Sequence, residues 1–180
     1  MIRVPRFIVR PAVAADLPAL GRLGARLARM HHAWDPRRFF VVPRMHEGYA
    51  WWLGKELKNR RAVVLAAVRG KRVVGYAYGR IEPRDWNALR DECAIGVDLI
   101  VDPSARGLGV GRALGVEMLR AFTAKGAPRV MLQTAAANRP ARAFFRHMGF
   151  RPTVVEMALE LGKPPRQRAA RPVVRSRRPR

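Results

Sequence analysis

Hydrophobic residues recur along the chain at two different spacings, and each spacing predicts one kind of element. Short runs of apolar residues predict strands, whereas apolar residues three or four positions apart predict amphipathic helices. Two of the runs, within residues 62–81, meet across Gly70 and Lys71, which is typical of an antiparallel hairpin. The predicted strands cover residues 7–10, the two arms of this hairpin, 93–101, 130–134 and a last strand or pair within 152–161.

Four helices are predicted between these strands. The first begins near Asp16, which we expect to cap it, with Pro18 in its first turn. The third carries an apolar stripe from Val110 to Phe122 and stops at Gly126. The other two cover residues 47–59 and 140–148. This order of elements predicts a mixed sheet with helices on its faces.

Basic residues are concentrated towards the C-terminal end. The chain of 180 residues carries a formal net charge of +23, and residues 162–180 contain eight Lys or Arg and no acidic residue. Four prolines and few large apolar side chains in this stretch predict a disordered tail. We therefore expect a folded domain over residues 1–161 and a basic tail over 162–180. Such a tail either contacts nucleic acid or ribosomes weakly through phosphates or is simply solvated.

Composition argues against several classes of protein. The N-terminal residues hold scattered arginines and no apolar stretch long enough for a signal peptide or a membrane span, so a cytoplasmic protein without membrane contact is expected. The single cysteine, Cys93, cannot form an internal disulfide, and the four dispersed histidines do not complete a zinc site with it. No metal is expected.

The stretch RGLGVGRALG, residues 106–115, places four glycines after an apolar run and before a predicted helix. The first turn of a helix has unpaired N–H groups and the positive end of the helix dipole, so it binds anions. Glycines keep side chains away from those groups, and an arginine at each edge of the loop adds positive charge. The stretch is therefore predicted to bind a diphosphate. The residues expected to contact it are Arg106, Gly107, Leu108, Gly109, Val110, Gly111 and Arg112.

Two commoner phosphate-binding motifs do not fit this spacing. A P-loop requires Lys and then Ser or Thr after its last glycine, but Gly111 is followed by Arg112 and Ala113. A dinucleotide-binding fingerprint requires a third glycine where Arg112 or Leu114 stands. Both motifs are excluded.

Three linked motifs resemble the GNAT superfamily of acyl-CoA-dependent N-acyltransferases. The first is Arg106-x-x-Gly109-x-Gly111, and the second is the strand and loop DLIVDPSA before it. The third is the segment 138–150, which matches the family pattern at Asn138, Ala141, Gly149 and Phe150. The resemblance covers about residues 7–161. It implies an α/β (α+β) GNAT fold, with a mixed central sheet of about six or seven strands flanked by about four helices.

The resemblance also implies acetyl-CoA as co-substrate. Its pyrophosphate would lie on the amides of the glycine loop. Its pantetheine arm would lie along the preceding strand and pair with the backbone of Leu99, Ile100 and Val101. Asn138 is similar to a family asparagine that contacts the pantetheine region, and it also fits a helix N-cap.

One position departs from the family pattern. Seven residues after the asparagine, where the family most often has a tyrosine that protonates the leaving thiolate, this chain has Phe145. We still place Phe145 beside the cofactor. A thiol has a pKa of about 8.5, so a thiolate can leave near neutral pH without a dedicated acid. The acid is water or a hydroxyl from elsewhere in the chain, with Tyr78 and Tyr76 as candidates; at least one of them is expected only to pack on its strand.

Asp98 is the expected catalytic carboxylate, because it is the acidic residue within the strand that would face the thioester. It could orient the amine or accept its proton, or it could be a structural group satisfied by backbone or an arginine. Asp91 and Glu92, at the entrance of the strand, are weaker candidates. The aromatic-rich segment 31–52 resembles the acceptor wall of the family, although its aromatic residues also suit a core.

The sequence therefore predicts an N-acetyltransferase that acetylates a primary amine by direct attack, acting as a monomer or homodimer. The acceptor is not identified. Two other functions stay open: a non-catalytic acyl-CoA-binding regulator, because of Phe145, and a protein that docks on nucleic acid or ribosomes through its basic tail.

Overall fold

The computed structural model describes residues 7–161. The chain divides into two compact units, residues 1–139 and residues 140–180, and each is described here by itself. The predicted basic tail, residues 162–180, lies outside the described residues, so its predicted boundary with the folded domain stays a prediction.

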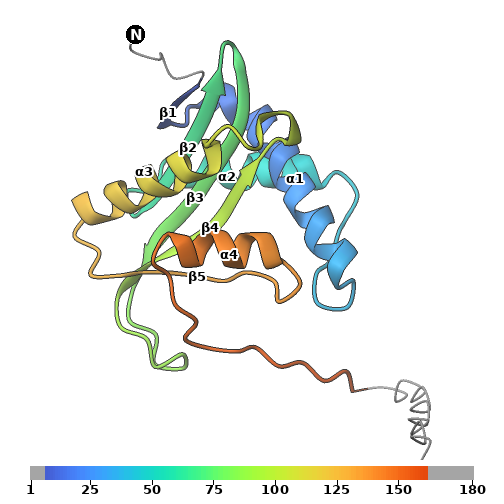
Figure 1. Cartoon of the computed structure of the whole chain (residues 1–180), viewed down its shortest axis with the longest axis vertical. Helices are drawn as coiled ribbons and strands as arrows, with labels where there is room; N and C mark the ends of the chain where they lie inside the picture. Colours follow the sequence, from blue (N-terminus) through green and yellow to red (C-terminus); the bar gives the residue numbers. More distant parts are fainter. Residues whose placement is uncertain (1–6, 162–180) are drawn as a thin grey trace, which may run out of the picture. The chain divides into compact units, whose positions relative to one another are not determined.

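The first unit is built on a five-stranded sheet with the order β1-β2-β3-β4-β5 (Figure 1). The first four strands pair with one another in antiparallel fashion, and β5 runs parallel to β4. The sheet is therefore mixed, as predicted. The strands are β1 (Ile8–Pro11), β2 (Ala62–Arg69), β3 (Arg72–Glu82), β4 (Cys93–Val101) and β5 (Val130–Leu132).

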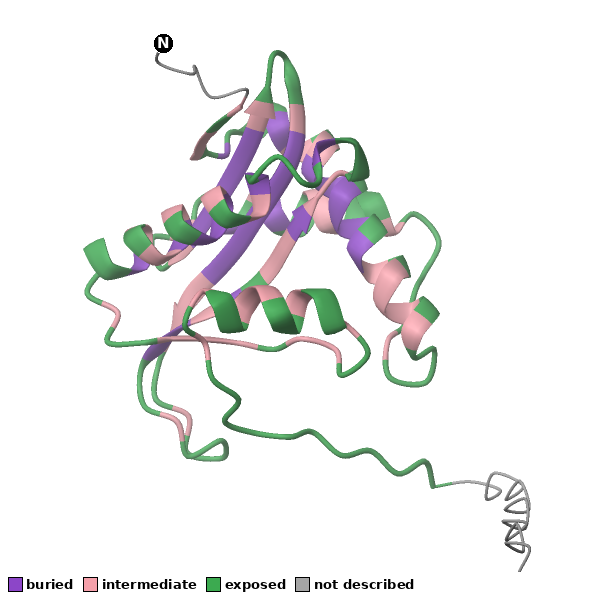
Figure 2. Ribbon diagram, viewed as in Figure 1, coloured by how far each residue is buried: buried purple, intermediate pink, exposed green. Residues whose placement is uncertain are grey.

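Helices cover both faces of this sheet. The first face is covered by α1 (Leu17–Trp34) and α2 (Met45–Glu56), which pack on each other, and the opposite face by α3 (Val110–Ala124). Two short 3-10 helices, η1 (Ala14–Asp16) and η2 (Pro103–Ala105), precede α1 and α3. The buried side chains form two cores, one on each side, and Figure 2 shows the buried positions running along β2 and β3 between the helices.

Most predicted elements are confirmed. The hairpin of β2 and β3 turns at Gly70, whose φ of 59° is one that glycine adopts without strain. The predicted stripe of α3 is buried: Val110, Leu114, Met118 and Phe122 are at most 3% exposed. Helix and strand ends differ from the prediction by a few residues, as in α2, which ends at Glu56 rather than at residue 59.

The predicted cap of α1 is wrong in its geometry. Asp16 precedes the helix, but its side chain accepts no hydrogen bond from the first turn. Because η1 comes directly before α1, the carboxylate turns back instead. It accepts a hydrogen bond from the Val13 amide at 2.9 Å and two from the Arg10 guanidinium at 2.7 and 3.0 Å. Asp16 thus ties β1 to the start of α1.

The second unit contains most of α4 (Arg139–His147) and the segment that follows it. The predicted last strand is not formed: residues 150–161 have no regular secondary structure (Figure 1). Their large apolar side chains are 78–95% exposed at Val154, Val155, Met157, Leu159 and Leu161. A strand needs a neighbour for its N–H and C=O groups, and the described part of this unit contains no other strand. The sheet has five strands within the described residues, fewer than the six or seven expected.

Among the helices within residues 7–161, none has both the length and the apolar character needed to cross a membrane.

Candidate active site

Asp98 lies at an irregular point of β4. Tyr78 pairs with Asp98 but Gly79 pairs with Gly96, so Val97 is an extra residue in β4 and forms a bulge. The Asp98 carboxylate faces the side of the sheet covered by α1 and α2, where the Tyr76 hydroxyl donates a hydrogen bond to its Oδ2 at 2.8 Å. Tyr76 is completely buried, whereas Asp98 keeps partial contact with solvent.

The surroundings of Asp98 disfavour its charged form. Burial raises the pKa of the Asp98 carboxyl, while the Tyr76 hydrogen bond and His31 act in the opposite direction. No ion pair of Asp98 with Lys or Arg occurs among the residues that the structure describes. A buried carboxylate without a cationic partner is costly in a folded protein, which makes it a candidate to bind a cation from outside.

Two tyrosines complete this side of the site. Burial raises the pKa of Tyr49 to about 12, with a contribution from the Asp98 charge, and burial together with the same charge raises the pKa of Tyr76 well above its ordinary value. Tyr49 comes from α2 and reaches the site because α1 has no side chain at Gly24, where a Cβ would lie 2.3 Å from the Tyr49 ring. Because both pKa values are raised, both tyrosines stay protonated at neutral pH.

Tyr78, the predicted acid, is the register partner of Asp98 on β3, but its hydroxyl interacts with Glu56 of α2. It is 2% exposed, and its pKa is raised by burial and by the Glu56 carboxylate of α2. The structure therefore pairs Asp98 with Tyr76, the other candidate hydroxyl, and pairs Tyr78 with α2. The part of Tyr78 in catalysis stays a prediction.

The predicted glycine loop has the geometry of an anion site. Gly107 and Gly109 have φ values of 73° and 82°, in the left-handed region that favours glycine. At the start of α3, the first backbone N–H to donate a helical hydrogen bond is that of Ala113, which bonds the Gly109 carbonyl at 3.0 Å. For the N–H groups of residues 107–112 no backbone acceptor is recorded in the described chain. Arg106 and Arg112 are both solvent-accessible beside them.

The open side of β4 leads to this loop. β5 pairs only with residues 94–96, so within the described chain no strand pairs with residues 97–101 on that side. Alternate N–H groups of a strand point in opposite directions, so this edge offers free donors and acceptors to an extended ligand. The loop lies at its end, since a Cβ at Gly111 would stand 3.6 Å from Val101 Cγ2 and 3.9 Å from Leu99 Cδ2.

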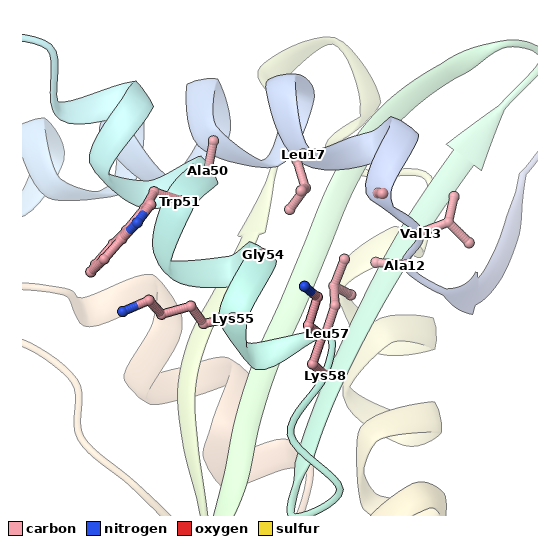
Figure 3. A pocket seen from close by; sticks show the side chains of 10 residues that line it. Ala12, Val13, Leu17, Ala50, Trp51, Gly54, Lys55, Leu57 and Lys58 are labelled. Carbon is pink, nitrogen blue, oxygen red and sulfur yellow. The ribbon is translucent and has the colours of Figure 1, made fainter.

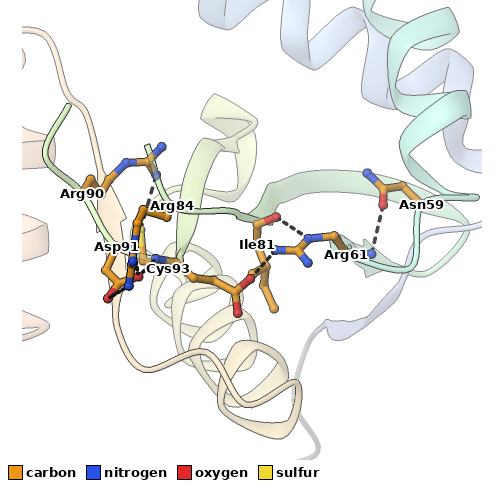
Figure 4. Close-up of polar contacts among 8 residues, drawn as sticks. Asn59, Arg61, Ile81, Arg84, Arg90, Asp91 and Cys93 are labelled. Atoms are coloured by element: carbon orange, nitrogen blue, oxygen red, sulfur yellow. Dashed lines mark hydrogen bonds and ion pairs between the residues drawn. The ribbon is translucent and has the colours of Figure 1, made fainter. Parts of the chain in front are cut away.

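The weaker carboxylate candidates lie elsewhere, at the base of the β3–β4 hairpin (Figure 4). Asp91 forms an ion pair with Arg84 at 3.1 Å, and Glu92 forms one with Arg61 at 2.7 Å. All four side chains are about half exposed. These pairs stabilise the hairpin surface and leave Asp98 as the carboxylate in the middle of β4.

The remaining predicted residues belong to the C-terminal part. Asn138 directly precedes α4, and Phe145 lies within it. The Phe145 ring is half-buried and packs edge-on against Phe144 and Phe150, with centroids 5.1 and 5.7 Å apart. Their roles toward the cofactor stay predictions.

An open apolar pocket of about 660 Å³ lies between η1, the start of α1 and α2 (Figure 3). Leu17, Trp51 and Leu57 form part of its wall, and Lys55 and Lys58 stand at its side. Ala50 and Trp51 belong to the segment 31–52 that was expected to form the acceptor wall, and the pocket contains none of the other predicted site residues. Within residues 7–161, no group of three His, Cys, Asp or Glu side chains could hold a metal ion.

Tyr49 and His31 influence the Asp98 carboxyl electrostatically, and neither was predicted to do so. Both fall in or next to the aromatic segment that was expected to form the acceptor wall. Gly24, a glycine within an otherwise regular helix, was the available signal that another element approaches α1 closely there.

Comparison with known proteins gives consistent matches. Residues 27–150 match the model of the acetyltransferase (GNAT) family. A mycothiol acetyltransferase from Acidothermus cellulolyticus is 32% identical over 137 residues, which are 74% of this chain and 36% of that protein. A glucosamine 6-phosphate N-acetyltransferase from Trypanosoma brucei brucei is 35% identical over 92 residues, which are 50% of this chain and 58% of that protein.

Solved structures agree with these matches at the level of the fold. The aminoglycoside N-acetyltransferase AAC(6')-Iy, solved in complex with CoA, superposes with a TM-score of 0.71 at 18% identity, over 89% of this chain and 97% of that one. The chain spans less than half the length of the mycothiol acetyltransferases that it matches, 40% for the protein from Thermomonospora curvata.

Proposed function

Because the chain belongs to the acetyltransferase (GNAT) family, we propose that it transfers an acetyl group from acetyl-CoA to a primary amine by direct attack. The observation that carries this proposal is the open edge of β4, residues 97–101, which runs from Asp98 to the free N–H groups of the glycine loop. This arrangement suits a donor with an extended arm and a diphosphate at one end.

The chain's own groups fit such a donor. The N–H groups of residues 107–112, with Arg106 and Arg112 beside them, suit the diphosphate. The backbone of Leu99, Ile100 and Val101 would pair with the pantetheine arm, and a free N–H of β4 would stabilise the oxyanion. The complex of AAC(6')-Iy with CoA supports acyl-CoA as the ligand. Because cells hold acetyl-CoA in the cytoplasm, we place the enzyme there.

Asp98 would receive the acceptor. Its carboxylate has one hydrogen bond from Tyr76 and no basic partner within the described residues, so it can accept a hydrogen bond from an ammonium group. Stripping a proton from an amine of pKa about 10 is the harder step of the reaction. The CoA thiolate needs less general-acid assistance to leave. This is consistent with Phe145, which cannot donate a proton, at the position where the family most often has tyrosine. Tyr78 and Tyr76 remain the candidate acids.

The class of acceptor is proposed from the relatives. Their names give glucosamine 6-phosphate and aminoglycosides as substrates of those proteins, and both carry amino groups on sugars. A carboxylate at the acceptor side favours a cationic amine over a neutral or anionic acceptor. We propose a small amino compound of this kind.

The test is release of CoA thiol by the purified chain with acetyl-CoA and a panel of amines: glucosamine 6-phosphate, an aminoglycoside, a polyamine and a lysine peptide. The proposal predicts release above the acceptor-free rate with at least one amine, and an acetylated product by mass spectrometry. Tight binding of acetyl-CoA with no release across the panel would contradict the proposal and favour the acyl-CoA-binding regulator.

A further inference from the structure

The pocket between η1, the start of α1 and α2 lies outside the site proposed for the reaction. Its volume of about 660 Å³ falls within the range of about 300–1,000 Å³ that holds small ligands in proteins. Leu17, Trp51 and Leu57 give it an apolar wall (Figure 3). Trp51 is 62% exposed, so an apolar ligand in the pocket would remove part of a large indole from water. The pocket therefore suits a ligand with a hydrocarbon body.

The absence of a side chain at Gly54 leaves room in this pocket. Gly54 is one of its lining residues, and a Cβ there would lie 3.3 Å from Leu17 Cδ1 on the other wall. Gly48, in the same helix, does not line the pocket, and a Cβ there would meet nothing within 4 Å. A side chain introduced at position 54 would thus enter the pocket, whereas one at position 48 would not.

The charged side chains at the pocket are both cationic. Lys55 and Lys58 stand at its side, and no Asp or Glu lines it (Figure 3). The Lys55 ammonium lies 3.7 Å from the centroid of the Trp51 ring, so one cation stands directly beside the apolar wall. Neither lysine forms an ion pair within the described residues. An anionic group on the ligand can therefore bind them without displacing an existing partner.

This charge distinguishes the pocket from the acceptor side of the proposed active site, where Asp98 would receive an ammonium group. The two places also use different sides of α2. Tyr49 packs against Gly24 of α1, whereas Trp51 lines the pocket. Residues two apart in a helix point about 200° apart around its axis. The pocket is thus a separate site, and its charge does not suit a cationic acceptor.

We propose that this pocket binds a small amphipathic anion, a carboxylate with a hydrocarbon chain of the fatty-acid class. The hydrocarbon chain would lie against Leu17, Trp51 and Leu57, and the carboxylate would contact the ammonium groups of Lys55 and Lys58. The proposal does not depend on the transferase reaction, so binding can be measured whether or not the chain turns over acetyl-CoA.

The first test is calorimetric titration of decanoate into the full chain and into Gly54→Leu and Gly48→Leu. Leucine is more favourable than glycine in a helix, so both variants should fold. We expect saturable binding by the wild type and by Gly48→Leu. Binding by Gly54→Leu should be at least about tenfold weaker, because the new side chain takes the space of several CH₂ groups of the ligand. No binding by the wild type, or equal binding by all three proteins, would overturn the proposal.

The second test varies the ligand. Each CH₂ added between butanoate and decanoate should tighten binding by up to about fourfold, because a buried CH₂ contributes about 0.8 kcal/mol. Decyltrimethylammonium, which has the same chain and a cationic head, should bind much more weakly than decanoate. An affinity that does not change with chain length would show only general attraction of anions to a chain of net charge +23. Equal affinity for both head groups would show only apolar adhesion, and either result would overturn the proposal.

The third test removes the positive charges. The double variant Lys55→Gln with Lys58→Gln should bind decanoate at least about threefold more weakly, a modest loss because both lysines are exposed. Lys71→Gln, in the exposed turn between β2 and β3, is the matched control and should bind as the wild type does. Equal affinity of the double variant and the control would contradict the proposed contact with the carboxylate.

A second copy of the chain is the other candidate occupant of the pocket. Sedimentation of the wild type and of Gly54→Leu without ligand distinguishes the two. The proposal predicts the same oligomeric state for both proteins, whereas a wild-type dimer that Gly54→Leu dissociates would overturn it.

Discussion

The Asp98 carboxylate receives its hydrogen bond from the hydroxyl of Tyr76. Its place as the carboxylate within a buried strand was predictable, but its partner was not. Tyr76 and Tyr78 lie on the same face of β3, and the choice between them depends on the pairing register of β3 and β4. The bulge at Val97 shifts that register, and no local sequence pattern marks it.

At the residue scale, Asp98→Asn separates a catalytic from a structural role. Burial raises the pKa of Asp98, so the folded state resists its ionisation, and stability falls as pH rises through the interval between the unfolded and folded pKa values. The amide keeps an acceptor for Tyr76 without the charge. We expect kcat to fall by about 10² or more, while the free energy of unfolding at pH 7, from urea denaturation, is unchanged or higher. Marked destabilisation at pH 7 would identify Asp98 as a structural group.

Phe145→Tyr tests the missing acid. If the pocket keeps the family shape, the added hydroxyl should reach the sulfur and raise kcat, with acetyl-CoA affinity little changed. Steady-state rates and a pH profile on the folded variant decide this. An unaltered or lowered rate, with both proteins losing activity at alkaline pH near a tyrosine pKa, would show that another group already serves as the acid, and would direct attention to Tyr78 and Tyr76.

At the scale of elements, periodicity predicted which segments are helices and strands, but not every partner. The buried side of α3 could be predicted from local sequence alone, because apolar residues at helical spacing mark the face of a helix that packs on the core. A strand forms only where another strand can pair with its N–H and C=O groups. The apolar pattern of residues 152–161 therefore predicted a strand that the structure does not form. The Asp16 cap failed for a related reason, since a contact with Arg10, six residues earlier, replaced the local one.

The contact between β1 and α1 gives an element-scale prediction. The Asp16 carboxylate is 7% exposed, and the Arg10 guanidinium lowers its pKa. We expect Asp16→Asn to lower the free energy of unfolding by about 1–3 kcal/mol at pH 7. A lowered pKa adds stability above the ordinary carboxyl range, so the difference from wild type should shrink as pH falls below about 4.

The control for this prediction is Glu47→Gln, which breaks a solvent-exposed pair with Arg44 and should therefore change the free energy of unfolding much less than Asp16→Asn does. Chemical denaturation at pH 7 and pH 3 provides the comparison. Equal losses for Asp16→Asn at both pH values would show that the charge of Asp16 does not stabilise this junction.

At the scale of the whole molecule, the net charge of +23 is not explained by the proposed reaction. If residues 162–180 bind nucleic acid, the binding should be indifferent to sequence and should weaken steeply between about 50 and 200 mM salt. Filter binding or fluorescence anisotropy with unrelated oligonucleotides measures this, with the chain ending at Leu161 as control. Binding that persists at high salt, or survives the truncation, would contradict a role for this segment.

The central claim is that the glycine loop at the end of β4 binds the diphosphate of acetyl-CoA, and calorimetric titration of acetyl-CoA tests it most directly. Gly111→Glu places negative charge among the free N–H groups. A Cβ there makes only ordinary contacts, and Gly111 is not among the glycines with positive φ, so the variant should fold. Val116→Glu adds the same charge at an exposed position of α3 as control. We predict saturable binding by wild type and Val116→Glu, and at least about tenfold weaker binding by Gly111→Glu, a difference of about 1.4 kcal/mol. Unchanged affinity in a folded Gly111→Glu variant, or no binding by wild type, would contradict the account.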